Sequence, residues 1–197
     1  MGEICAIILA AGESKRMGFP KMLLDFNGKS MLEMVIENVK GSDVNNIMVV
    51  LGAENKRLSE LVDRMNVKYC SNSNYKKGML SSVRCGIRNI PKDCDAILVF
   101  QGDQPLISKD VTNVVIDAYR SSDKEIVIPV CNNKRGHPIM IGKKYLDKIE
   151  ILDDNEGLRS LAYLYSDDVL EVETNNPAIL RDFDTYDEYK KEINQIL

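Results

Sequence analysis

The chain has 197 residues, of which 44% are hydrophobic and 28% are charged, and 26 basic against 30 acidic residues give it a formal net charge of −4. This composition excludes a disordered chain, and 12 Gly and 6 Pro are too few for a collagen-like or low-complexity one. The acidic balance argues against the basic face that nonspecific nucleic-acid binding needs, so we expect no nucleic-acid partner.

The length predicts one domain over residues 1–197, because ordinary domains hold roughly 150 residues. The apolar run 4–11 lacks a preceding Lys or Arg and is too short for a bilayer span, so we expect no membrane partner and a cytoplasmic location. Five cysteines without Cys-x-x-Cys spacing predict reduced thiols rather than a disulfide framework or a zinc site.

Apolar stretches of strand length alternate with stretches of helical period, which is typical of an α/β fold with a mostly parallel sheet and helices on both faces. The predicted strands are 4–10, 47–51, 67–70, 96–100, 126–130 and 138–141. The predicted helices are 30–39, 55–65, 80–89, 109–120, 143–150, 157–165 and 186–196, and residues 131–136 are predicted as a polar turn. Ser30 followed by Glu33 is a capping box. Ligands bind at the carboxyl edge of such sheets, so we expect the loops after strands 4–10 and 96–100 to meet there.

The first loop, residues 9–21, reads Leu-Ala-Ala-Gly-Glu-Ser-Lys-Arg-Met-Gly-Phe-Pro-Lys. Its glycines permit close approaches of the backbone, and Lys15, Arg16 and Lys21 place three cations within seven positions. Such a loop suits a polyphosphate, although it matches neither the P-loop nor the dinucleotide-binding fingerprint. The alternative is a solvated turn with scattered positive charge.

The second segment, residues 74–82, brings Gly78 and two serines to the start of a predicted helix. The N–H groups and partial positive charge of a helix N-terminus can hold polar or anionic ligand atoms. Helix capping is the competing explanation for a serine at this place.

The third segment, residues 100–105, carries Asp103 straight after a buried strand, between a glycine and a proline turn. A carboxylate there can bind Mg²⁺ through one oxygen while water and phosphate complete the octahedron. The alternative is an aspartate that serves the turn and the cap of the next helix.

The fourth segment carries Asp182 and Asp184 just before the last predicted helix. Residues two apart on an extended segment share a face, so both carboxylates can converge on one cation with Asp103. Asp184 is also the right residue type for a helix N-cap, and spacing alone leaves both explanations open.

The fifth segment, residues 134–138, contains His137, the only histidine of the chain. A lone histidine is more often structural than catalytic. With no second histidine and no Gly-x-Ser-x-Gly motif, a common zinc site and a serine-hydrolase triad both lack support.

Together these segments closely resemble the nucleotidyltransferases of the molybdenum-cofactor type, and among them the CTP:molybdopterin cytidylyltransferase branch. The matching residues follow the family order over nearly the whole chain: 9–21, 78–82, 102–105, 135–138, 154–159 and 182–185. The guanylyl-transferring relatives have Leu-Ala-Gly-Gly and Asp-Lys where this chain has Leu-Ala-Ala-Gly and Pro-Lys, which favours cytosine over guanine. One departure is Tyr186, where the family usually shows proline at the helix start; we expect metal binding to survive this change.

The resemblance implies a Rossmann-like sheet of the glycosyltransferase-A type whose first loop encloses CTP. It implies a nucleotide site formed by Leu9, Ala10, Ala11, Gly12, Arg16, Lys21, Gly78, Ser82 and Asp103. Arg16, Lys21 and Asp103 are the expected catalytic residues, and Asp103 and Asp184, with Asp182 beside them, are the expected Mg²⁺ ligands. The residues expected to face the pterin are Arg135, Gly136, His137 and Arg159.

The reaction that the resemblance implies is attack of the terminal phosphate of molybdopterin on the α-phosphate of CTP, with release of pyrophosphate. A phosphate monoester has its second pKa near 6, so this nucleophile needs no general base. Two alternatives stay open: a nucleotidyltransferase for another phosphorylated acceptor, such as a sugar or polyol phosphate, and a non-catalytic carrier of the molybdenum cofactor. A molybdenum hydroxylase that receives the product is a further expected partner.

Overall fold

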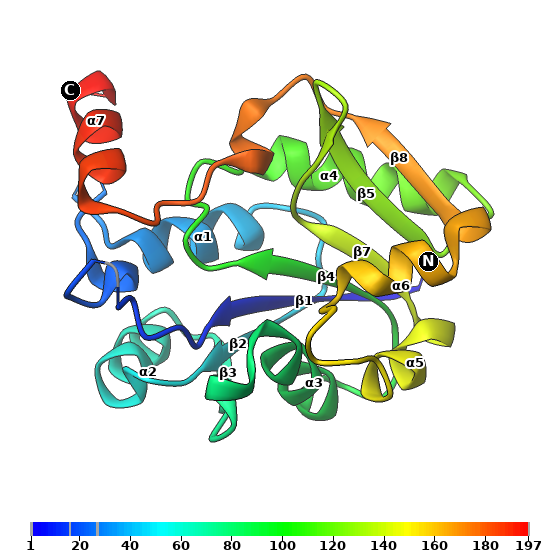
Figure 1. Cartoon of the computed structure of the whole chain (residues 1–197), viewed down its shortest axis with the longest axis horizontal. Helices are drawn as coiled ribbons and strands as arrows, with labels where there is room; N and C mark the ends of the chain where they lie inside the picture. The colour runs from blue at the N-terminus through cyan, green and yellow to red at the C-terminus, as the bar shows by residue number, and fades with distance from the viewer. Residues whose placement is uncertain (1, 16, 27, 197) are drawn as a thin grey trace.

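The computed structural model describes residues 2–15, 17–26 and 28–196, and its strands join in one mixed sheet (Figure 1). The strands are β1 (Glu3–Ala10), β2 (Asn46–Leu51), β3 (Lys68–Ser71), β4 (Cys94–Gln101), β5 (Ile126–Cys131), β6 (Lys134–Arg135), β7 (Ile139–Gly142) and β8 (Val169–Glu173). Their order is β3-β2-β1-β4-β7-β5-β6, with β8 also paired to β5. Strands β3, β2, β1 and β4 are mutually parallel, whereas β7 runs antiparallel to both β4 and β5.

Helices cover both faces of the sheet. The α-helices are α1 (Met31–Lys40), α2 (Asn55–Arg64), α3 (Met79–Asn89), α4 (Lys109–Ser121), α5 (Leu146–Glu150), α6 (Arg159–Leu164) and α7 (Tyr186–Ile196). Short 3₁₀ turns are η1 (Lys21–Leu23), η2 (Tyr75–Lys77), η3 (Lys143–Tyr145), η4 (Ser166–Asp168) and η5 (Pro177–Leu180). Within the described ranges, every helix is too short or too polar to cross a membrane.

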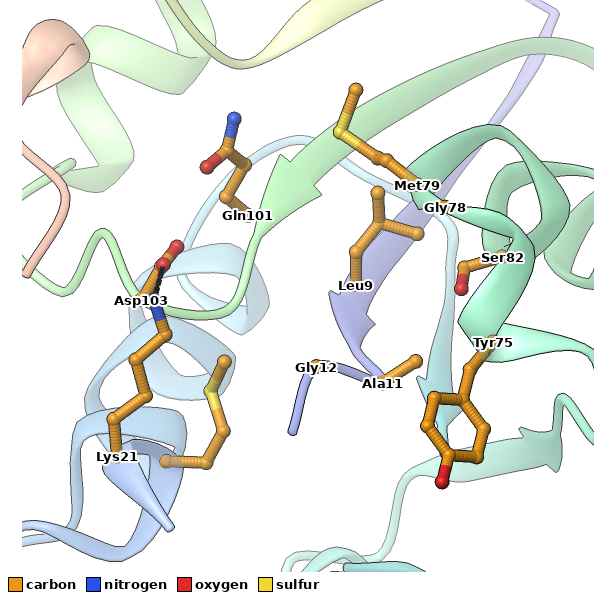
Figure 2. Close-up of a pocket in the computed structure, with 11 residues that line it drawn as sticks. Leu9, Ala11, Gly12, Lys21, Tyr75, Gly78, Met79, Ser82, Gln101 and Asp103 are labelled. Atoms are coloured by element: carbon orange, nitrogen blue, oxygen red, sulfur yellow. Dashed lines mark hydrogen bonds and ion pairs between the residues drawn. The ribbon is translucent and has the colours of Figure 1, made fainter. Parts of the chain in front are cut away.

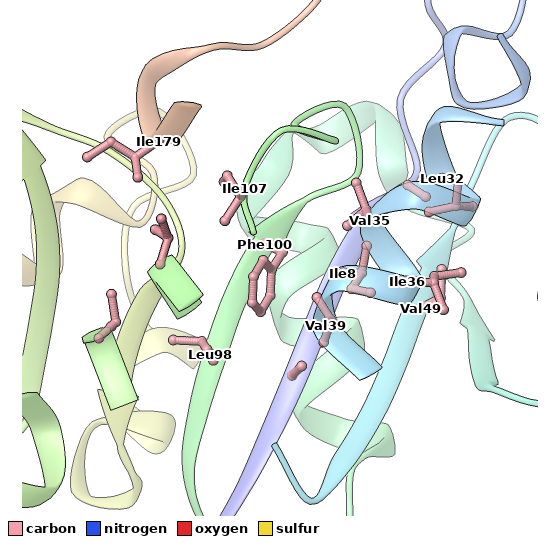
Figure 3. Packing of buried hydrophobic residues seen from close by; sticks show 14 of the residues in the cluster. Ile8, Leu32, Val35, Ile36, Val39, Val49, Leu98, Phe100, Ile107 and Ile179 are labelled. Atoms are coloured by element: carbon pink, nitrogen blue, oxygen red, sulfur yellow. The ribbon is translucent and has the colours of Figure 1, made fainter. Parts of the chain in front are cut away.

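The core follows from the alternation of side chains along β1, which is buried along almost its whole length. Ile8 belongs to the cluster that α1 and α4 cover, where Val35 and Phe100 also pack (Figure 3). Its neighbours Ile7 and Leu9 point to the other face and pack against α3, α5 and the start of α6. A strand buried on both faces lies in the middle of the sheet, so the loop that leaves β1 starts from a rigid position.

The predicted fold class, an α/β domain with a mostly parallel sheet, is confirmed, and each predicted strand overlaps an observed one. The capping box of Ser30 and Glu33 forms at the start of α1 as predicted. The polar turn predicted at 131–136 is present at residues 132–133, with β5 and β6 paired on either side of it. One helix prediction was wrong. The helix predicted over 143–150 is split into η3 and the shorter α5.

Candidate active site

A pocket of about 280 Å³ lies at the carboxyl ends of β1 and β4 (Figure 2). It is lined by Leu9, Ala11, Gly12, Lys21, Met22, Tyr75, Gly78, Met79, Ser82, Gln101 and Asp103. Because β1 and β4 are parallel neighbours, their following loops leave the sheet at the same edge and meet, as the sequence predicts. Figure 2 shows Lys21 and Asp103 on one side of the pocket and Tyr75 and Ser82 on the opposite side.

Two glycines, one directly after β2 and one directly after β4, let the backbone approach the end of β1 closely. The N–H of Gly102 donates to the carbonyl oxygen of Leu9 at 2.9 Å, and a Cβ on Gly102 would lie only 2.9 Å from that oxygen. On the other side, a Cβ on Gly52 would lie 2.4 Å from the carbonyl oxygen of Ala11. Any larger residue at either position would push the loop 10–12 out of place.

The first loop curls back on itself and returns Lys21 to the pocket. Ser14 adopts a positive φ of 52°, its carbonyl oxygen accepts from Met17 N at 3.0 Å, and its hydroxyl oxygen accepts from Lys21 N at 3.1 Å. Lys15 points to solvent and pairs with Glu13 at 2.8 Å. Arg16, the second predicted phosphate ligand, lies outside the described residues. Lys21 is therefore the first-loop cation that the described residues place in the pocket.

Carboxylates from two distant segments converge beside Lys21. Oxygens of Asp103, Asp182 and Asp184 all lie within 4.8 Å of one another. Phe183, between the two aspartates of the second segment, points the opposite way and packs against Phe26. This alternation along an extended segment brings both carboxylates to one side, as the spacing predicts.

The segment that carries Asp182 and Asp184 is held by a small hydrophobic cluster of its own. Phe183, Tyr189 and Ile193 pack against Phe26 and Met31, and Leu106 links this cluster to the core cluster that α1 and α4 cover.

The Lys21 ammonium joins this carboxylate group. Its Nζ contacts Asp103 Oδ2 and lies 3.3 Å from Asp184 Oδ1, and its side chain is only 13% exposed. Burial alone would lower the pKa of Lys21, but the charges of Asp103 and Asp184 outweigh it and raise that pKa above its ordinary value. Burial, aided by the charges of Asp103 and Asp184, raises the pKa of Asp182. The site thus concentrates negative charge that a nearby cation compensates.

Helix capping, the competing explanation for the aspartates, is performed by other residues. Ser108 caps α4, accepting from Val111 N at 3.4 Å. Thr185 accepts from Glu188 N at 3.3 Å, and Glu188 Oε2 in return accepts from Thr185 N at 2.9 Å, so these two residues form the cap of α7.

The start of α3 forms the opposite wall of the pocket. Gly78 has a φ of 101°, a conformation that favours glycine, and this lets α3 begin directly after η2. The buried amide of Asn72 donates to Ser81 Oγ at 2.9 Å and to Ser82 Oγ at 3.0 Å, which holds the first turn of α3 in place. Sequence reasoning missed Asn72, although it follows β3 at the same sheet edge, and it also missed Tyr75, Met79 and Gln101.

A second cavity of about 260 Å³ gathers the four residues expected to face the pterin, Arg135, Gly136, His137 and Arg159. Its other lining residues are mainly apolar: Ile126, Ile128, Ile139, Ile141, Leu158, Leu161, Ala162 and Tyr163. Arg135 Nε donates to Glu171 Oε1 at 2.7 Å, and its guanidinium lies 5.9 Å from the centre of the Tyr163 ring. A Cβ on Gly136 would lie 2.4 Å from the carbonyl oxygen of Ile179, so glycine is required at this turn.

His137 lies between the second cavity and β4. Its Nδ1 is 3.3 Å from the carbonyl oxygen of Val99; a carbonyl only accepts, so Nδ1 carries the proton and Nε2 of the neutral ring can accept. Burial lowers the pKa of His137, against the opposing effects of the Val99 bond and the charge of Asp103. The lowered pKa favours the neutral ring at pH 7.

One expected nucleotide-site residue lies elsewhere. Ala10 is only 1% exposed and packs in the core cluster beneath α1, rather than lining the pocket. It ends β1 and so supports the loop that follows. The geometry thus offers one pocket with Lys21 and Asp103 at one side and a second, largely apolar cavity that Arg135, His137 and Arg159 also line.

The sequence of this chain is similar to those of several known proteins. A family model described as MobA-like NTP transferase domain matches residues 6–169. The molybdenum cofactor cytidylyltransferase of Escherichia coli (strain K12) is 27% identical over 190 residues, which cover 96% of this chain and 95% of that protein. The bifunctional protein GlmU of Clostridium kluyveri is 29% identical over 159 residues, which cover 79% of this chain. The chain spans only 35% of the length of that GlmU protein.

Solved structures share the fold over the whole chain. Rv0371c from Mycobacterium tuberculosis H37Rv superposes with a TM-score of 0.87 at 21% identity, covering 98% of both chains, and a second structure of it is a complex with manganese. CMP:2-keto-3-deoxy-manno-octonic acid synthetase complexed with CTP superposes with a TM-score of 0.77 at 16% identity, covering 99% of this chain and 98% of the other. At these identities the likeness establishes the fold.

Proposed function

The chain belongs to the family of MobA-like NTP transferase domains, and from this premise we propose that it is a nucleotidyltransferase that transfers CMP from CTP to the terminal phosphate of molybdopterin, releasing pyrophosphate. The observation that carries the proposal is the convergence of Asp103, Asp182, Asp184 and Lys21 beside the first pocket. The similarity to the Escherichia coli cytidylyltransferase over nearly the full length of both chains supports the choice of substrates.

The three carboxylates fit a divalent cation, and we propose Mg²⁺. Their oxygens are the hard ligands that Mg²⁺ prefers, and they lie close enough together to be shared by one ion. Such an ion, when bound, neutralises phosphate charge and so lowers the repulsion between two anionic esters. The manganese complex of Rv0371c, which has the same fold, agrees with a divalent metal.

The remaining groups of the first pocket position CTP. Lys21 provides positive charge for the phosphates, and Arg16 stays a predicted partner in that role. The backbone at Gly12 and the first turn of α3, including Ser82, line the opposite part of the pocket, where we place the ribose and base. With reactants so placed, catalysis works by positioning and charge neutralisation.

The second cavity is the proposed acceptor site. Isoleucine side chains from β5 and β7 give it the apolar walls that a fused ring system can pack against, and Arg135 and Arg159 give it positive charge for an anionic acceptor. The Nε2 atom of His137 can accept a hydrogen bond from a ring N–H.

A sugar or polyol phosphate is the second candidate acceptor, since GlmU and the synthetase that acts on an octonic acid are similar to this chain. The apolar lining favours the pterin, because a sugar site needs hydrogen-bonding groups where this cavity has isoleucines.

Pyrophosphate release tests the proposal. Purified protein with CTP, molybdopterin and Mg²⁺ should release pyrophosphate and stop on addition of EDTA. The four NTPs tested with molybdopterin establish the base, and sugar or polyol phosphates tested with CTP establish the acceptor. Molybdopterin binding without pyrophosphate release would instead identify a carrier.

A further inference from the structure

The Lys21 ammonium lies where the carboxylates would share a cation. It contacts Asp103 Oδ2 and lies 3.3 Å from Asp184 Oδ1, and oxygens of these residues and Asp182 lie within 4.8 Å of one another. The side chains of Lys21 and Asp103 are only 13% and 10% exposed, so little water screens the contact. The positive charge of Lys21 thus compensates the carboxylates in the metal-free protein.

We infer that Lys21 and the divalent cation of the proposed function compete for the oxygens of Asp103 and Asp184, so that Lys21 is available to the nucleotide phosphates only after the cation has taken those oxygens. Mg²⁺ binds carboxylate oxygens at about 2.0 to 2.1 Å. An ammonium that kept its hydrogen bonds to the same oxygens would lie about 4 Å from the ion, where the repulsion between the two cations is more than about ten times thermal energy even at an effective dielectric constant of about 20. Both cations therefore cannot hold these oxygens together.

The surroundings of Lys21 permit this exchange without rearrangement of the loop. Its backbone is fixed, because Lys21 N donates to Ser14 Oγ at 3.1 Å and its carbonyl oxygen accepts from Leu24 N at 3.1 Å. Its side chain lines the pocket itself, on the same side as Asp103 (Figure 2). A flexible four-carbon stem can swing from the carboxylates into the pocket while the backbone stays in place.

The exchange couples metal and nucleotide binding. In the protein without nucleotide, Lys21 opposes the metal, so metal affinity is lower than it would be without the Lys21 charge. A polyphosphate in the pocket offers the ammonium another anionic partner and removes that opposition. Metal and nucleotide therefore each raise the affinity for the other, as linkage requires. Lys21 acts here as a positioning residue as well as a phosphate ligand.

Mn²⁺ binding to the nucleotide-free protein, measured by electron paramagnetic resonance, tests the competition without reference to turnover. Lys21→Met should bind Mn²⁺ about tenfold more tightly than wild type, because the competing charge is gone. Lys21→Arg keeps the charge and should stay near wild type. The matched control is Lys144→Met, which removes an exposed lysine that pairs with Asp168 at 2.6 Å, outside the residues that line the pocket. This control should leave Mn²⁺ affinity unchanged.

Unchanged or weaker Mn²⁺ binding by a folded Lys21→Met variant would overturn the inference. Should that variant fail to fold, the wild-type protein supplies the second measurement. The lysines of the wild-type protein can be labelled by ¹³C-methylation, and the Lys21 signal is the one that is missing from the spectrum of Lys21→Arg. This signal should shift on addition of Mg²⁺. A Lys21 signal that does not move would also overturn the inference. If Lys21→Met binds Mn²⁺ more tightly as expected but the wild-type protein releases no pyrophosphate, the result counts against the proposed substrates alone. The two proposals can therefore be tested separately.

Discussion

His137 donates from Nδ1 to the carbonyl oxygen of Val99 at 3.3 Å, in the strand that ends two residues before Asp103. The backbone N–H of His137 also donates to Ile179 at 3.1 Å. The first bond ties His137 to β4, the strand that precedes Asp103, and the second ties it to η5. If His137 contacts the acceptor as proposed, backbone contacts on two sides hold its ring for that role.

His137→Ala should weaken use of the acceptor and spare the nucleotide. Losing the Nε2 acceptor and the Val99 bond should raise the KM for molybdopterin about tenfold, the cost of about one hydrogen bond. The dissociation constant for CTP, measured by calorimetry, should stay within twofold of wild type. A selective loss of CTP binding would contradict the assignment of His137 to the acceptor cavity.

The same histidine should make stability depend on pH. Burial lowers the pKa of His137 in the folded protein below the value of about 6.5 that it has in the unfolded chain. As the pH falls below about 6.5, the unfolded chain therefore binds a proton at His137 before the folded protein does, and this favours unfolding. The stability that the neutral ring contributes is thus fully present above about pH 6.5, and it decreases as the pH falls toward the pKa of His137 in the folded protein. Between about pH 7.5 and pH 5.5, the Tm of wild type should fall more than that of His137→Asn. Equal decreases in Tm would show that His137 contributes nothing.

Asp103→Ala should remove both metal binding and turnover. Asp103 is buried and is one of the three carboxylates that the described residues bring together here, so we expect a loss of about a hundredfold or more, since even an outer-shell substitution can cost that much at a metal site. Pyrophosphate release and Mn²⁺ binding measure this loss, and circular dichroism checks the fold. Asp117→Ala, on the exposed side of α4, is the control, and it should keep both pyrophosphate release and Mn²⁺ binding. Near-normal turnover by Asp103→Ala would refute the metal assignment.

Asn72→Ala should loosen the wall of the nucleotide pocket. Its amide holds the hydroxyls of Ser81 and Ser82, and its Oδ1 accepts from Asn74 N at 2.9 Å. We expect the KM for CTP to rise about tenfold, the equivalent of about one hydrogen bond, with the KM for the acceptor unchanged. Asn89→Ala, at the exposed far end of α3, is the control. Equal effects on both substrates would indicate general unfolding of α3 instead.

The sequence predicted the elements of the sheet well because buried strands and amphipathic helices leave strong patterns. The strand β1 is an example: residues 4–10 are continuously apolar, and both faces of the strand prove to be covered. By contrast, β8 (Val169–Glu173) was missed. Apolar residues and glutamates alternate along this half-buried strand, and the pattern is too short to distinguish from a loop.

Side-chain partners within the site were beyond the reach of sequence. The spacing of Asp182 and Asp184 suggested a shared face, but only the fold brings Asp103 to them and gives the cap of α7 to Thr185. Nothing in the local sequence indicated that Lys21 pairs with Asp184, because the two residues are 163 positions apart. Asn72 likewise appears ordinary until β3 is placed beside β2.

The segment that carries Asp182 and Asp184 is held through Phe183, Tyr189 and Ile193 on the small cluster around Phe26 and Met31, outside the central sheet. A segment that buries less apolar surface than the central sheet opens locally at a lower free-energy cost. Opening or proteolytic removal of residues 181–196 would carry Asp182 and Asp184 away while the eight-residue strands β1 and β4 stayed paired. Activity would then disappear during gentle heating or limited digestion well before the circular dichroism of the sheet changes.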